Sequence, residues 1–361
     1  MKASRVRSRP YGNDEVAGRS RAGILDAVLV IRMNEPHRAR TQAVAGAIHR
    51  QFDRAFPDEP HFGMHVMVRR VRCTSGRQRG LVYLQRFPGS QLALQDLAHF
   101  SMDTGYVNYL SESEKRDVLR WTGEALGKNV AFVAGAYIEN QPGDIVALYR
   151  QQMDLIVQAG GIPILFQSTR LHGLSSKEKA AVYQAACKGF PHVLAFELGA
   201  MFAPNGEIFD DETVRRLMDI PEIKGMKHSS LDRLIELQRL ALRDAHRPDF
   251  RIYTGNDLGI NMIEYGSDYL LGLASFAPEK FAERDRLWKS GDPAYYALSD
   301  DLQYLGNVAF RPPVPAYKHS AAVFLHMTGR IPTDRVHPKN PKRPAWEEEI
   351  LRDCARRLGY C

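Results

Sequence analysis

The segment Ile-Lys-Gly-Met-Lys-His-Ser-Ser at positions 223–230 is an apolar stretch that ends in one lysine followed by small hydroxyl residues. A short apolar run of this kind between two helical patterns is typical of an interior strand of a parallel sheet. Because side chains alternate along a strand, Lys227 shares a face with Gly225 and Ser229, and we expect Gly225 to leave space for a substrate. His228 then points toward the surrounding helices. Burial lowers the affinity of an amine for its proton, so Lys227 is a candidate nucleophile.

The chain downstream of residue 110 alternates short apolar runs with helical patterns, which predicts βα units around a parallel sheet. Strands are predicted at residues 129–137, 162–168, 192–199, 223–229, 250–257 and 268–276. Helices are predicted between them at residues 111–126, 143–159, 175–188, 211–218 and 231–244. This order favours an α/β fold, a (β/α)8 TIM barrel with its functional residues at the carboxyl ends of the strands.

The first βα unit of such a barrel is expected to be atypical. Two more strands must come from upstream of residue 110, and one of them ends near positions 103–106. The other is either 65–71 or 81–87, which leaves only residues 91–100 for the intervening helix. Additional C-terminal helices are predicted at residues 278–304, 315–328 and 345–358. We therefore divide the chain into an N-terminal segment, a barrel and a helical extension, at residues 1–90, 91–280 and 281–361.

The N-terminal segment, residues 1–90, carries most of the positive charge. It contains 17 basic and seven acidic residues, a net charge of +10 in a chain whose total is +7. Such a segment raises the hypothesis of a nucleic-acid-binding protein, but it lacks aromatic interleaving and a recognition motif, so this alternative ranks last. A second hypothesis is that a shifted reading frame produced this composition.

The four cysteines, Cys73, Cys187, Cys354 and Cys361, show no paired spacing, so we expect reduced thiols in a cytoplasmic protein. The most apolar N-terminal run, residues 22–31, is interrupted by an aspartate and is too short to span a bilayer. The histidines have no ligand spacing and no glycine-rich phosphate loop occurs, so no metal and no cofactor are expected.

Several segments together resemble the dihydrodipicolinate synthase and N-acetylneuraminate lyase family of class I aldolases, over about residues 101–330. Residues 223–230 are similar to the family's G-[IV]-K-[DE]-[ST]-S segment, and residues 103–114 are similar to its T-T-G-E-x-x-x-L-[ST]-x-x-E block. Residues 255–257 are similar to its G-x-D turn, and 269–278 to its glycine-rich eighth strand. The resemblance implies a divergent member of this family.

The resemblance also implies roles for individual residues. Lys227 takes the position of the lysine that forms a Schiff base with pyruvate or a related 2-oxo acid. The predicted substrate-binding residues lie at strand ends and comprise Asp103, Thr104, Gly105, Phe196, Ser229, Asn256, Asp257 and Ser275. Phe196 stands where the family has a proton-relaying tyrosine, and a phenyl ring relays no proton. Either Glu197, Tyr106 or Tyr137 supplies the acid/base function, or the chemistry differs from that of the family. Glu197 and Tyr106 are the available candidates near Lys227.

These features predict a lyase or aldolase that acts on a pyruvate-like 2-oxo acid through a Schiff base on Lys227. The alternative is a barrel that binds a carboxylate metabolite without turnover. A homo-oligomer, a dimer or a tetramer, is expected from the resemblance alone. The residues do not identify the substrate, because loops at the rim of the barrel determine specificity.

Overall fold

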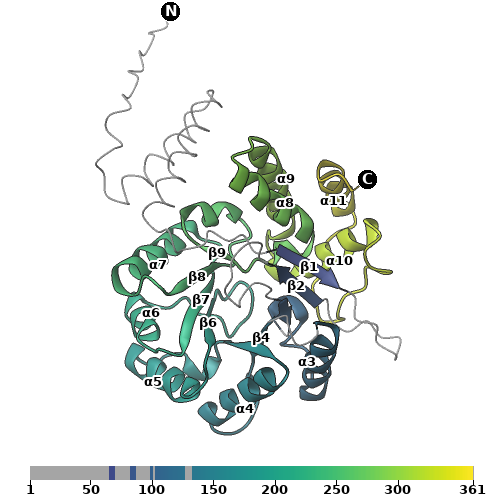
Figure 1. The fold of residues 1–361 in the computed structure, drawn as a ribbon. Coiled ribbons are helices and arrows are strands. Elements are labelled where there is room, and N and C mark those ends of the chain that lie inside the picture. Colours follow the sequence, from purple (N-terminus) through teal and green to yellow (C-terminus); the bar gives the residue numbers. More distant parts are fainter. Residues whose placement is uncertain (1–64, 70–81, 87–97, 101, 127–131, 361) are drawn as a thin grey trace, which may run out of the picture. The chain divides into compact units, whose positions relative to one another are not determined.

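A sheet whose strands pair in chain order lies at the centre of the protein (Figure 1). The computed structural model describes residues 65–69, 82–86, 98–100, 102–126 and 132–360, all within one unit, His61–Cys361. The strands in these ranges are β1 (His65–Arg69), β2 (Val82–Arg86), β3 (Ala98–Phe100), β4 (Phe132–Ala136), β5 (Gly161–Leu165), β6 (Val193–Leu198), β7 (Ile223–Ser229), β8 (Arg251–Thr254) and β9 (Asp268–Tyr269). Strands β3 to β9 are parallel, which confirms the predicted α/β class.

The start of the sheet differs from a regular βα unit. One strand was predicted at either 65–71 or 81–87, and both segments contain strands, β1 and β2. These two strands pair antiparallel, and β2 pairs antiparallel with β3. The helix predicted at residues 91–100 is wrong at positions 98–100, which form β3, and its residues 91–97 lie outside the described ranges. Apolar runs predict that strands exist, whereas their direction depends on pairing with distant strands.

Helices cover the outer face of the parallel sheet (Figure 1). They are α3 (Glu112–Leu126), α4 (Ile145–Gln158), α5 (Ser176–Cys187), α6 (Asp211–Met218) and α7 (Arg233–His246). Side chains cap the starts of several of these helices. Ser175 and Glu178 form a capping box, and the Asp210 carboxylate accepts a hydrogen bond of 2.6 Å from the Thr213 N–H group.

The C-terminal region is helical, as predicted. It contains α8 (Pro278–Ser290), α9 (Ala294–Ala309), α10 (Tyr317–Met327) and α11 (Glu347–Arg357). The single helix predicted at 278–304 is two helices, because Gly291 ends α8 in the left-handed conformation with φ of 69° and Pro293 follows it.

Short 3-10 helices complete the described secondary structure. They are η2 (Asp103–Gly105), η3 (Thr169–Leu171), η4 (Ile260–Tyr265), η5 (Leu273–Ser275) and η6 (Val314–Ala316). The strand predicted at residues 268–276 is much shorter than expected, because η5 forms within its second half.

Two apolar clusters pack on opposite faces of the sheet. The outer cluster lies between the strands and α4 to α7, and Ala195 and Met226 belong to it. The inner cluster joins the other face of the strands to the C-terminal helices, and Phe196 and Tyr253 belong to it. Adjacent residues such as Ala195 and Phe196 thus enter different clusters, which is the alternation expected of a sheet buried on both faces. No helix in the described ranges is both long and apolar enough to cross a membrane.

Candidate active site

Lys227 lies near the carboxyl end of β7, and its side chain points to the inner face of the sheet. It lines a small, partly open cavity. The residues around this cavity come from strand ends, from η2 and from the C-terminal helical region, and they are Asp103, Thr104, Phe196, Leu198, Phe202, Lys227, Ser229, Asp257, Gly272, Phe310 and Tyr317. The predicted strand and the predicted shared face of Lys227 and Ser229 are therefore both confirmed.

The ammonium of Lys227 is held in surroundings that favour its neutral form. Burial lowers the pKa of Lys227 to about 8, although the charges of Asp257 and Asp103 act in the opposite direction. Lys227 Nζ lies 4.8 Å from the ring centroid of Phe196, and among the described residues no hydrogen bond or ion pair engages this nitrogen. An amine in this state can attack a carbonyl carbon near neutral pH.

Asp257 faces the cavity from the end of β8. Its Oδ1 accepts a hydrogen bond of 2.7 Å from the N–H group of Leu273 in η5. Burial raises the pKa of Asp257 to about 7, while the backbone hydrogen bond and the Lys227 charge oppose that rise. Asp257 and Lys227 are thus a buried acid and a buried base whose pKa values approach each other.

Asp103 connects the start of the parallel sheet to the C-terminal region. It lies in η2, and its Oδ1 accepts a hydrogen bond of 3.0 Å from Lys318 Nζ. Its Oδ2 accepts a hydrogen bond of 3.0 Å from the Tyr317 hydroxyl. Thr104 follows Asp103 and also lines the cavity, and a Cβ atom at Gly105 would meet no atom within 4 Å. The turn that carries the predicted substrate-binding residues Asp103 and Thr104 therefore borders the cavity of Lys227.

Two glycines determine how closely β8 approaches β7. A Cβ atom at Gly255 would lie 1.9 Å from Ser229 Oγ and 2.8 Å from Lys227 Cε, so only glycine fits beside the lysine. A Cβ atom at Gly225 would lie 2.9 Å from Cε2 of Tyr253. The expectation that Gly225 leaves space for a substrate is wrong, because the Tyr253 ring occupies that space.

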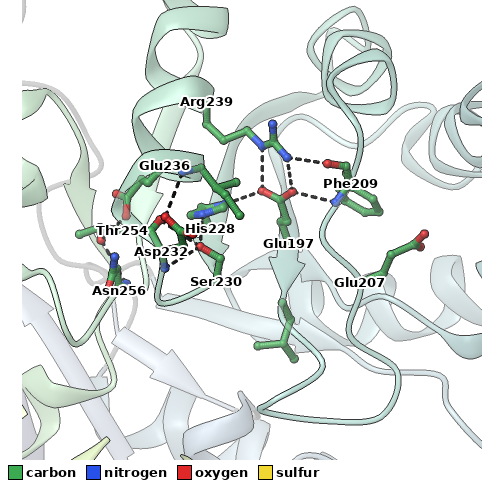
Figure 2. Close-up of polar contacts among 12 residues, drawn as sticks. Glu197, Glu207, Phe209, His228, Ser230, Asp232, Glu236, Arg239, Thr254 and Asn256 are labelled. Atoms are coloured by element: carbon green, nitrogen blue, oxygen red, sulfur yellow. Dashed lines mark hydrogen bonds and ion pairs between the residues drawn. The ribbon is translucent and has the colours of Figure 1, made fainter. Parts of the chain in front are cut away.

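Glu197 does not face the cavity, and its prediction as the acid/base residue is not supported by its position. It follows Phe196 on β6, points to the opposite face and is 0% exposed (Figure 2). Its carboxylate accepts hydrogen bonds from Arg239, from His228 Nδ1 and from the Phe209 N–H group. Although burial alone would raise the pKa of Glu197, the hydrogen bonds and charges of His228 and Arg239 lower it.

Tyr106, the other predicted acid/base residue, also lies outside the cavity lining. Its backbone is left-handed with φ of 62°, and its ring stacks on Tyr109 at a centroid distance of 6.2 Å. The ring also contacts His337. Tyr106 thus packs against Tyr109 and His337 and does not line the cavity of Lys227. Tyr137, at the end of β4, packs edge-on against Phe166, and burial raises its pKa to about 12.

The remaining predicted residues divide between the cavity and the core. Phe196 lines the cavity at the position where a tyrosine was expected. Asn256 and Ser275 are buried but do not line it. The Asn256 N–H group donates to Thr254 Oγ1, and the Ser275 hydroxyl donates to the Gly272 carbonyl (Figure 2 shows Asn256 beside Thr254). Both residues therefore support the strand ends that carry the site.

Residues of the C-terminal helical region were missed as site residues. Tyr317 and Phe310 line the cavity, and Lys318 reaches Asp103. From the sequence alone, Tyr317 and Lys318 are interpreted as residues that pack the helical extension or lie on an oligomer surface. In the sequence, Tyr317 and Lys318 are two polar residues at the start of a helix that follows prolines. This pattern does not reveal that both side chains contact Asp103, which lies more than 200 positions away. The described part of the chain holds no cluster of three or more His, Cys, Asp or Glu residues arranged for a metal.

Comparisons with known proteins agree with this geometry. A family model described as "Protein of unknown function (DUF993)" matches residues 134–333. No curated protein sequence matches the chain.

Solved structures of dihydrodipicolinate synthases are similar in fold. The synthase of Thermotoga maritima is 16% identical with a TM-score of 0.62, and the similarity covers 73% of this chain and 87% of that chain. YagE, a prophage protein of the dihydrodipicolinic acid synthase family from Escherichia coli K12, solved with pyruvate, is 16% identical with a TM-score of 0.63, covering 74% and 89%. The chloride-inhibited synthase of Acinetobacter baumannii, also solved with pyruvate, is 19% identical with a TM-score of 0.60, covering 72% and 86%.

The family match covers more than half of the chain, and the structures share its fold. The chain therefore belongs to the DUF993 family of proteins of unknown function, and its fold is similar to that of the dihydrodipicolinate synthases.

Proposed function

We propose that this protein is a class I aldolase or lyase that binds a pyruvate-like 2-oxo acid as a Schiff base on Lys227. The observation that carries the proposal is a buried amine, with its pKa lowered to about 8, that ends an interior strand and faces a cavity. Two of the structures with the same fold were solved with pyruvate, which supports this class of substrate.

The cavity offers partners for each part of such a substrate. In the proposed complex, Thr104 and the backbone amides after it bind the carboxylate of the oxo acid. The carbonyl carbon then lies at Lys227 Nζ, and Asp257 balances the positive charge of the iminium ion. The apolar side chains of Phe196, Leu198 and Phe202 exclude water from the bond that forms.

The proposal includes a closed (β/α)8 barrel, and the nearness of β1 to η5 and α8 supports closure. It also includes a cytoplasmic homo-oligomer. Cys187 and Cys354 are buried free thiols, in agreement with a reduced protein. The division into segments 1–90, 91–280 and 281–361 stays a prediction, because residues 1–64 lie outside the described ranges.

Reduction with borohydride in the presence of pyruvate tests the proposal. We expect the peptide that contains Lys227 to gain the mass of a reduced pyruvate adduct, and Lys227→Ala to abolish this gain. Lys224→Ala is the matched control, because Lys224 lies on the same strand but donates to the Pro221 carbonyl at the other end. Absence of an adduct across a panel of 2-oxo acids would overturn the proposal. Ligand-induced melting shifts that persist in Lys227→Ala would instead support a non-catalytic carboxylate-binding barrel.

A further inference from the structure

We propose that Tyr317, from the C-terminal helix α10, is the general acid and base for the Schiff base on Lys227. The inference rests on the function proposed above, because it assigns the proton transfers of that reaction. The phenolic side chain of Tyr317 lines the same cavity as Lys227, and its hydroxyl donates a hydrogen bond of 3.0 Å to Asp103.

The need for such a residue follows from the chemistry of the step. Attack of the neutral amine on the carbonyl gives a carbinolamine, whose hydroxyl leaves as water only after it receives a proton. The iminium ion must then lose a proton from its α-carbon to become an enamine. A positioned acid/base residue accelerates transfers of this kind by roughly 10²- to 10⁴-fold.

The residues around the cavity leave few candidates. The hydroxyls of Thr104 and Ser229 are far weaker acids than a phenol. Asp257 carries a titratable carboxyl, but the Leu273 N–H group holds its Oδ1, and its charge acts on Lys227 more strongly than that of Asp103 does. Asp257 therefore suits the role of counterion to the iminium ion. Asp103 also lines the cavity, but its two oxygens already accept hydrogen bonds from Lys318 and from Tyr317. Among the described lining residues, the phenol of Tyr317 is then the remaining candidate acid and base.

The ring of Tyr317 is held against the ring of Phe310. It stacks on Phe310 with centroids 4.4 Å apart and planes 17° apart. A Cβ atom at Gly272 would lie 3.0 Å from the Phe310 ring and 3.4 Å from Cε2 of Tyr317, so the glycine lets both rings approach the cavity. A catalytic group fixed in this manner loses little freedom when the substrate binds.

A charged partner stabilises the phenolate that forms when Tyr317 gives up its proton. Lys318 Nζ lies 5.1 Å from the centroid of the Tyr317 ring and 3.0 Å from Asp103 Oδ1. Its positive charge offsets the charge of Asp103 and attracts a phenolate oxygen. Asp103 orients the Tyr317 hydroxyl. Lys318 is a positioning residue, because its positive charge balances the negative charge of Asp103.

The step balances without a further reactant. The Tyr317 hydroxyl protonates the carbinolamine oxygen, the C–O bond breaks, and water leaves together with formation of the C=N bond. The Tyr317 phenolate then removes a proton from the α-carbon, and the electron pair of that C–H bond forms the enamine C=C bond while the C=N electrons return to nitrogen. Amine and oxo acid have become enamine and water, and Tyr317 is a phenol again.

Two measurements on Tyr317→Phe test the inference, each with pyruvate as the probe. The first is the final extent of borohydride trapping, and the second is the rate at which the pyruvate methyl group takes up deuterium in D2O, followed by NMR. We expect methyl exchange to fall by about 10²-fold or more while the final extent of trapping is kept. Tyr149→Phe is the matched control, because its hydroxyl is also buried but donates to the Phe166 carbonyl away from the cavity.

The outcomes separate the two proposals. Failure of the wild-type protein to trap pyruvate or any other 2-oxo acid contradicts the Schiff base itself. Normal trapping with methyl exchange in Tyr317→Phe within threefold of the wild type overturns the role of Tyr317, as does an equal loss in Tyr149→Phe. Loss of exchange in Asp257→Asn alone assigns the transfers to Asp257 and also overturns it. Fluorotyrosine at position 317, which preserves packing, should move the pH profile of exchange to lower pH, and an unmoved profile contradicts the inference.

Discussion

Replacement of Glu197 by alanine should destabilise the protein without affecting the chemistry of Lys227. The carboxylate accepts hydrogen bonds of 2.8 Å from the Phe209 N–H group and 2.8 Å from Arg239 Nη2, and a bond of 3.1 Å from Arg239 Nε. His228 Nδ1 lies 2.5 Å from Oε2 of Glu197, the oxygen that also accepts from Arg239 Nε. Removing one partner from a buried ion pair costs about 3–5 kcal/mol, because the remaining charge stays buried.

The expected loss of stability in Glu197→Ala is large enough to be measured in two independent assays. Urea unfolding at pH 7 should give a free energy of unfolding lower by about 3–5 kcal/mol, and scanning calorimetry should give a Tm lower by on the order of 10 °C. Borohydride trapping with pyruvate should still modify Lys227 at a temperature where the variant is folded, because Glu197 lies on the opposite face of the sheet.

Glu212→Ala is the control for the Glu197 prediction. Glu212 also pairs with arginines, Arg215 and Arg216, but its side chain is 50% exposed, so its loss should cost less than about 1 kcal/mol. A cost below about 1 kcal/mol for Glu197→Ala would refute the reasoning. Loss of trapping in a folded Glu197→Ala protein would restore the catalytic role first predicted for Glu197.

The free energy of unfolding as a function of pH, measured in acid, gives a third test of the role of Glu197. Its pKa is lowered in the folded protein, so its charge contributes stability above the unfolded value of about 4.3, and this contribution is lost as pH falls through the lower folded value. The difference in stability between the wild type and Glu197→Gln should therefore be full at neutral pH and shrink in acid. A difference that stays constant down to the acid transition would contradict the assigned pKa direction.

Three further predictions concern the cavity. Gly255→Ala should displace Lys227 and Ser229. It should lower the trapping rate by about tenfold and the free energy of unfolding by about 1–3 kcal/mol. Unchanged trapping would contradict the close approach of β8 to β7. The trapping rate should rise with pH up to about 8, the pKa of Lys227. At pH 7 an amine with a pKa of about 8 is neutral in about one molecule in ten, whereas an amine with a pKa of about 10.4 is neutral in about one in 2500. Asp257→Asn should move the midpoint of that profile to lower pH, since the Asp257 charge raises the pKa of Lys227, and a midpoint moved upward would refute this coupling.

Local patterns in the sequence predicted the parts of the site that lie on strands. Alternation along β7 placed Lys227 and Ser229 on one face, and it also placed His228 on the other. Strand-end reasoning located Thr104 and Asp257 at the cavity. These predictions succeeded because a parallel sheet brings the carboxyl ends of its strands to one edge, wherever the strands lie in the chain.

Contacts between distant segments were beyond such reasoning. Alternation along β6 predicts that Phe196 and Glu197 point to opposite faces of the sheet. It does not predict that Arg239 and His228 bind the Glu197 carboxylate on the outer face. The Tyr317 hydroxyl bonds a residue 214 positions away, and no periodicity in either segment encodes that contact. The antiparallel pairing of β1 and β2 likewise depends on tertiary packing, whereas the apolar runs predict only that strands form.

The link between Asp103 and Lys318 has a consequence for the synthesis of the protein. The two residues are 215 positions apart, and at about 5–20 residues per second a ribosome needs about 10–40 seconds to proceed from one to the other. During this interval the segments that contain Asp103 and Lys227 emerge, but the segment that contributes Tyr317 to the cavity lining has not been translated. Truncated products that end before α10 therefore cannot complete the cavity, which forms only near the end of translation.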